Sequence, residues 1–88
     1  MADTTGRQLI LKDGTIIDGT AGYSDGFLWL YLSGYTLLET AEVFCDPEKT
    51  ETIEFKSGAE DHVYERFTEC RSIMTDADGN LSVCMTKP

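Results

Sequence analysis

Alternating apolar and polar residues open the chain and predict β-strands. The first such run covers residues 8–12, and Asp13 and Gly14 follow it directly, as in tight β-hairpins. A second strand is expected at residues 15–17. Because glycines interrupt the pattern that follows, a bulge or bend is predicted near residues 20–23.

The most apolar run, residues 27–32, follows a turn at residues 24–26 and alternates aromatic residues with leucines. One face of the strand is therefore aromatic and the other aliphatic. Apolar residues on both faces predict a central strand that is covered on both sides. In an alternative interpretation, Trp29 or Tyr31 stays partly exposed within a binding face, since aromatic residues are enriched at interfaces.

A helix is predicted over about 37–45. Thr36 and Glu39 have the spacing of a capping box, and the residue before Pro47 avoids the α region, which ends the element. Apolar residues at helical spacing form the stripe expected to pack on the sheet: Leu37, Leu38, Ala41, Phe44 and Cys45. Three polar residues lie off that stripe: Glu39, Thr40 and Glu42.

The second half of the chain alternates again. A fourth strand is predicted at 52–56, with Ile53 and Phe55 inward and a turn at residues 57–58. Residues 62–74 fit a helical face as well as strands. Strand propensities favour two segments, 62–65 and 67–74.

A final strand at 81–85 is expected to form a hairpin with the segment before it. Its inward residues are predicted to be Leu81, Val83 and Met85. The element order β-β-β-α-β-β-β indicates an α+β domain, with a curved antiparallel sheet or small barrel and the helix closing one side. The 88 residues are expected to form one domain, 1–88, with a loose N-terminal end at 1–6.

Candidate chemistry is sparse. His62, beside Asp61, could serve as an oriented base for a cysteine nucleophile, but no spacing brings such groups together. Residues 76–80 resemble the start of a calcium loop, yet their glycine is misplaced and a hairpin turn is expected. The protein is therefore predicted not to be an enzyme and to hold no metal or cofactor.

Three widely spaced cysteines, Cys45, Cys70 and Cys84, are expected to be reduced thiols that act as small apolar residues. The first residues lack the pattern of a signal peptide, and the longest apolar run is too short to cross a bilayer. A cytoplasmic location in a bacterial host is expected.

Charge is the most informative property. The net charge of −9, from 16 acids and 7 bases, argues against direct binding to nucleic acid or to membranes. Residues 39–69 hold ten acids and three bases, and therefore carry −7. These carboxylates either solvate the surface or imitate the phosphates of a nucleic acid. The residues predicted to bind a partner are Glu39, Glu42, Glu48, Glu51, Glu54, Trp29 and Tyr31.

Residues 34–50 and 64–68 resemble small uncharacterised proteins encoded in prophages of gut Gram-positive bacteria. The resemblance covers most of the chain and assigns no catalytic residues. It implies a phage setting, in which small acidic proteins inhibit host defence, as anti-CRISPR proteins do, or serve as tail and head–tail accessory parts.

Three hypotheses follow. In the first, a non-enzymatic inhibitor binds the basic surface of a host defence or nucleic-acid-handling protein through residues 39–69. In the second, a structural or tail accessory protein forms homo-oligomers through strand edges and the aromatic face of residues 27–31. In the third, the protein sequesters a small signal molecule between subunits. The cationic residues available for that role are Arg7, Lys12, Arg66 and Arg71.

Overall fold

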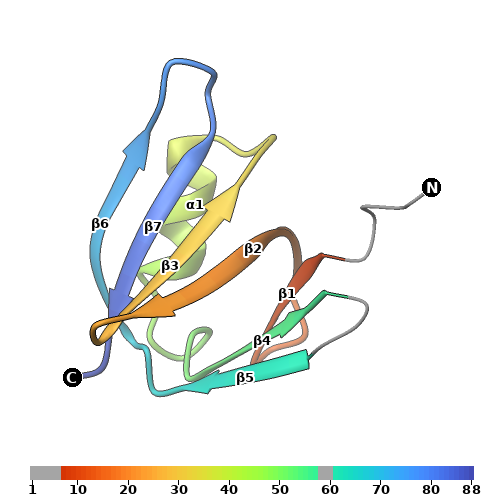
Figure 1. Ribbon diagram of the computed structural model, residues 1–88, viewed down its shortest axis with the longest axis vertical. Coiled ribbons are helices and arrows are strands. Elements are labelled where there is room, and N and C mark those ends of the chain that lie inside the picture. Colours follow the sequence, from red (N-terminus) through yellow and green to blue (C-terminus); the bar gives the residue numbers. More distant parts are fainter. Residues whose placement is uncertain (1–6, 58–60) are drawn as a thin grey trace.

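The computed structural model describes residues 7–57 and 61–88 and shows seven strands in one curled sheet with one short helix (Figure 1). The strands are β1 (Gln8–Leu11), β2 (Ile16–Ser24), β3 (Phe27–Leu32), β4 (Thr52–Lys56), β5 (Asp61–Glu65), β6 (Glu69–Thr75) and β7 (Leu81–Thr86). Helix α1 (Leu37–Phe44) follows β3. The α+β class and the predicted order are confirmed. Residues 1–6, predicted to be a loose end, lie outside the described residues. The same holds for Gly58 of the turn predicted at residues 57–58.

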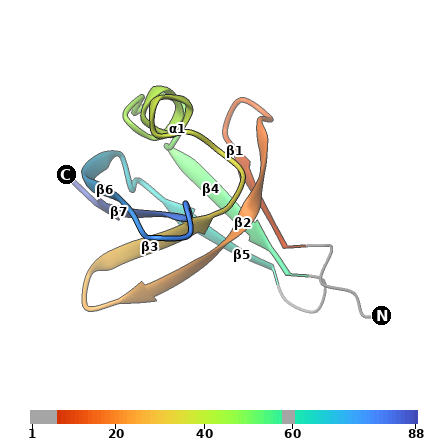
Figure 2. The same cartoon turned by 90° about the horizontal axis from the view of Figure 1, so that it is seen from above.

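The sheet order is β5-β4-β1-β2-β3-β7-β6, and every neighbouring pair is antiparallel. Its two edges, β5 and β6, are consecutive in the chain, so the sheet must curl until residues 66–68 can connect them (Figure 2). Phe67 is buried in this connection, and the Arg66 N–H donates to the Glu51 carbonyl oxygen at 2.8 Å. The two strands predicted at residues 62–65 and 67–74 correspond to β5 and β6 and are confirmed.

Strand β2 links the two halves of the sheet. It pairs with β1 up to Asp18 and with β3 from Gly19 onward. A Cβ on Gly19 would lie 2.6 Å from the Tyr31 carbonyl oxygen and 2.7 Å from Cδ2 of Leu32. Only glycine permits so close an approach. The predicted bulge near residues 20–23 is wrong, because β2 runs through that region with an unbroken register to β3.

The predicted hairpin turns are confirmed. Asp25 and Gly26 both have positive φ, 53° and 85°, which gives the β2–β3 turn the twist of a two-residue hairpin. At the β6–β7 turn, the Asp76 carboxylate accepts hydrogen bonds from the backbone N–H groups of Asn80 and Asp78, at 3.0 and 2.8 Å. These bonds lower the pKa of Asp76 and show residues 76–80 acting as a turn.

The core fills the inside of the curl. The inward residues predicted for β4 and β7 are confirmed, although Phe55 is only partly buried. The buried apolar side chains that form one cluster are Leu9, Leu11, Ile17, Leu28, Leu30, Leu32, Phe44, Ile53, Phe67, Leu81, Val83 and Met85. Alternation along each strand supplies these residues to a single face.

Helix α1 packs on this core through a different stripe from the predicted one. Thr40 and Phe44, one turn apart, are 2% and 0% exposed. Leu37 and Leu38 are 52% and 69% exposed, and Cys45 is also exposed, so the predicted stripe is wrong at these three positions. Burial of Thr40 is possible because its hydroxyl donates to the Thr36 carbonyl oxygen at 2.9 Å. A polar residue can thereby occupy an inward position.

Strand β3 is covered on one face only. Its leucines are buried, whereas Phe27 and Tyr31 are 40% and 50% exposed and Trp29 is partly buried. The prediction of a strand covered on both sides is wrong, because the core and α1 lie on the leucine side. The alternative prediction, that Trp29 or Tyr31 stays partly exposed, is confirmed, whereas a binding face there stays a prediction.

Candidate functional site

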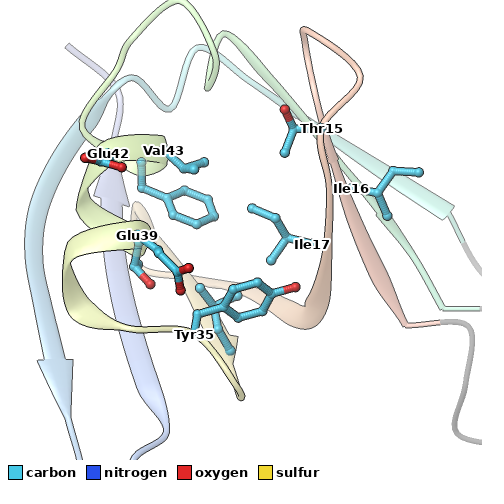
Figure 3. A pocket seen from close by; sticks show the side chains of 10 residues that line it. Thr15, Ile16, Ile17, Tyr35, Glu39, Glu42 and Val43 are labelled. Atoms are coloured by element: carbon cyan, nitrogen blue, oxygen red, sulfur yellow. The ribbon is translucent and has the colours of Figure 1, made fainter.

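A pocket of about 280 Å³ lies between α1 and the start of β2 (Figure 3). Its apolar lining includes the buried residues Ile17, Leu32 and Phe44 and the partly buried Val43. Residues of the β1–β2 hairpin form one wall and residues of α1 form the other. The pocket is therefore a recess that opens from the core to the surface.

Tyr35 holds the two walls of this pocket together. Its side chain lines the pocket and packs against the core. The Tyr35 hydroxyl accepts a hydrogen bond from the backbone N–H of Asp18 at 3.0 Å. Because Tyr35 belongs to the connection between β3 and α1, this bond fixes the start of the helix relative to β2.

Glu39 brings a carboxylate to the edge of the pocket, and the start of α1 fixes its position. Oε1 of Glu39 accepts a hydrogen bond from the Thr36 N–H at 2.9 Å, and Oγ1 of Thr36 accepts one from the Glu39 N–H at 3.1 Å. The predicted capping box is thus confirmed. Glu42 lines the pocket further along α1, and both glutamates are exposed.

Glu48 and Glu51 lie on a different surface, where bases accompany the acids. They share a shallow depression beside the β1–β2 turn with Lys12, Lys49, Asp13 and Asp46. The Lys12 N–H donates to the Lys49 carbonyl oxygen at 3.1 Å, which joins the two loops. The pKa of Asp13 is lowered by hydrogen bonds from the Thr15 hydroxyl and backbone N–H. The two lysines offset part of the negative charge here.

Glu54 lies on the outer face of the sheet. The strand register places it in one cross-strand row with Ile16, Ile10 and Val63. Ile16 and Val63 are exposed at the two ends of that row. The structure thus brings Glu39 and Glu42 together, and it brings Glu48 and Glu51 together. Glu54 stands apart from both pairs, among apolar side chains.

Trp29 and Tyr31 form a further surface on the outer face of β3. The residues paired with them across the sheet are small: Gly22 and Cys84 flank Trp29, whereas Thr20 and Ser82 flank Tyr31. Tyr31 is half exposed between its small neighbours, whereas Trp29 is partly buried. This aromatic surface and the pocket lie on opposite faces of the sheet.

The cysteines are free thiols. Cys70 in β6 and Cys45 at the end of α1 are close enough for their thiols to hydrogen-bond. Burial, aided by Cys45, raises the pKa of Cys70 to about 11, and burial also raises the pKa of Cys84.

His62 lies exposed in β5, with its ring centroid 6.3 Å from that of Tyr64. Among the described residues, no group of three or more His, Cys, Asp or Glu side chains could hold a metal ion.

No local pattern in the sequence marks the pocket as a unit. Tyr35, Ile17 and Val43 belong to separate elements, and they meet where α1 and its entry pack on the core beside β2. The capping box and the acids Glu39 and Glu42 are local signals that point to this region.

Comparison with protein-family models, curated protein sequences and solved structures gives no significant match. Within residues 7–57 and 61–88, no helix has the length and apolar character needed to span a membrane.

Proposed function

We propose that this is a phage-derived, non-enzymatic binding protein that acts in the cytoplasm of a bacterial host. It occupies a basic surface of a defence or nucleic-acid-handling protein, as anti-CRISPR inhibitors do. The observation that carries the proposal is the exposed pair Glu39 and Glu42 on α1, beside an apolar pocket. The phage setting rests on the resemblance of residues 34–50 and 64–68.

The exposed side of α1 has the mixed character of a protein interface. Its sequence, LLETAEVF, contains two acids and no base. Leu37 and Leu38 are exposed in the first turn, next to Glu39. Exposed apolar side chains beside charged ones are typical of surfaces that bind another protein. We therefore assign the main contact to α1.

Charge explains how such a surface would compete with a nucleic acid. A groove that binds phosphates presents lysine and arginine side chains, and carboxylates are attracted to the same groups. Association with a protein of net charge −9 would be fast and would weaken as salt screens the attraction.

The test is affinity capture of host proteins at low and at high salt, with identification of what is retained. We expect a basic nucleic-acid-binding protein to be retained at low salt and released at high salt. The quadruple variant Glu39→Gln, Glu42→Gln, Glu48→Gln and Glu54→Gln should lose it. Glutamine at residue 39 still completes a capping box, so the helix is preserved. Failure to retain a basic protein, or equal retention by the variant, would contradict the proposal.

A second candidate function is self-assembly as a phage structural or tail accessory protein. The exposed aromatic surface of β3 favours it, with Met74 of β6 also exposed. Self-assembly through the edge strand β6 is less favoured. A register shift between Cys70 and Ser72 interrupts this strand, and such bulges discourage edge pairing. Light scattering over a range of concentrations distinguishes the candidates. A monomer at every concentration contradicts self-assembly, whereas oligomers that Tyr31→Lys abolishes support it.

A further inference from the structure

We propose that the pocket between α1 and β2 receives one apolar side chain of the partner, with a neighbouring lysine or arginine of that partner facing Glu39. This inference rests on the proposed function and specifies the chemistry of the partner. The recognised feature is an apolar residue next to a basic one on a protein surface.

The size and lining of the pocket favour a single side chain. Its volume of about 280 Å³ falls just below the range of about 300–1,000 Å³ that holds most small-molecule ligands. Ile17, Leu32 and Phe44 are buried at its base, so an entering apolar group would leave water and contact other apolar groups. A larger ligand would extend beyond the walls.

The charge beside the pocket selects a cation. Glu39 is oriented by one hydrogen bond from the Thr36 N–H, and a carboxylate has further acceptor positions. Glu42 lines the same pocket. A lysine or arginine next to the inserted side chain could donate a charge-assisted hydrogen bond to Glu39. An acidic partner would instead be repelled.

The pocket is held in shape before any partner arrives. The bond between the Asp18 N–H and the Tyr35 hydroxyl ties the helix entry to β2, and the capping box orders the first turn. A site that is already ordered loses less conformational entropy on binding. The pocket should therefore bind small probes that carry the same two chemical features.

The first experiment titrates the ¹⁵N-labelled protein with phenethylammonium and, separately, with phenylacetate. The two probes share a phenyl ring and carry opposite charges. We expect phenethylammonium to shift the amide signals of Ile17, Tyr35 and Val43, and phenylacetate to bind more weakly. Equal binding of both probes, or shifts scattered away from the pocket, would overturn the inference.

Two variants sharpen this titration. Glu39→Gln should weaken phenethylammonium binding about threefold to tenfold, because a charged acceptor becomes neutral while the capping box remains. Asp25→Asn is the matched control, since it removes one charge at the β2–β3 turn, where asparagine tolerates positive φ. Equal weakening by both variants would mean that net charge, and not the pocket, attracts the probe.

Val43→Phe fills the pocket from the helix side and separates this inference from the proposed function. We expect it to lose both the probe and the host protein, with far-UV circular dichroism confirming the fold. If Val43→Phe retains the host protein while the quadruple glutamine variant loses it, the pocket inference fails and the proposed function stands. If Val43→Phe misfolds, the comparison of Glu39→Gln with Asp25→Asn decides the inference alone.

Discussion

On the inner side of the sheet, the apolar groups beside α1 are recessed next to a carboxylate, whereas on the outer side of β3 the aromatic rings are partly exposed. Hydrogen bonds hold the inner site in shape, from Tyr35 to β2 and within the capping box. The outer surface is a regular strand flanked by small residues. Both surfaces expose apolar area, and the inner one also carries the carboxylate of Glu39, which we propose selects a basic partner.

The largest effect should come from removing the anchor of α1. Phe44→Ala deletes a fully buried aromatic ring, and such losses cost about 3–5 kcal/mol of unfolding free energy. The pocket should be lost with the helix, while the outer surface of β3 keeps its strand pairing. Leu38→Ala, at a residue 69% exposed, is the control and should change stability by less than about 0.5 kcal/mol. Urea unfolding measures both variants, and a larger loss for Leu38→Ala would contradict the observed orientation of the helix.

Gly19→Ala should affect both surfaces together, because β2 links the two halves of the sheet at this residue. The added Cβ would meet the Tyr31 carbonyl oxygen at 2.6 Å, and overpacking of this kind costs about 1–3 kcal/mol. Gly22→Ala is the matched control in the same strand, where nothing lies within 4 Å of an added Cβ. Thermal unfolding should separate the two variants, and equal midpoints would count against a close contact at Gly19.

Thr36→Ala should weaken the inner site alone. It removes the hydroxyl that caps the Glu39 N–H, and losses of this type cost about 0.5–2 kcal/mol. We expect lower stability together with weaker phenethylammonium binding, because the start of α1 becomes less ordered. Thr36→Ser should restore both properties. An effect on stability without one on binding would show that the cap does not order the pocket.

The smallest effect concerns the thiols and is seen at alkaline pH. The pKa of Cys70 is raised from 9.0 to about 11 in the folded protein. The neutral thiol therefore favours the folded state below about pH 9, and this contribution is lost as the pH rises toward about 11. Cys70→Ala should flatten the fall in thermal stability over that interval.

Iodoacetamide labelling followed by mass spectrometry should show exposed Cys45 reacting before Cys70 and Cys84.

The strands and hairpins could be predicted from the sequence because their signals are local. Alternation identifies the inward face of β7, and an Asp-Gly pair at residues 25 and 26 supplies the positive φ of a tight turn. The rotation of α1 could not be predicted in this way. Thr40 satisfies its own hydroxyl within the helix, so a polar residue takes an inward position and two leucines remain outside.

The site was predictable only in part. Glu39 and Glu42 are neighbours on one helix, and the structure keeps them together at one pocket. Glu54 is close in sequence to Glu51, but strand pairing places it between Ile10 and Val63 on the outer face. A charge count along the chain does not contain that information. The pocket depends on contacts between distant segments, which no local pattern reveals.

The most direct test of the central claim compares two double variants that have the same net charge. Glu39→Gln with Glu42→Gln removes two carboxylates at the pocket, whereas Asp25→Asn with Asp78→Asn removes two from turns in other parts of the molecule. Their affinities for the captured host protein are measured by calorimetry at low salt. We expect the first pair to weaken binding strongly and the second to leave it close to wild type. Equal affinities for the two variants would contradict an acidic binding site on α1.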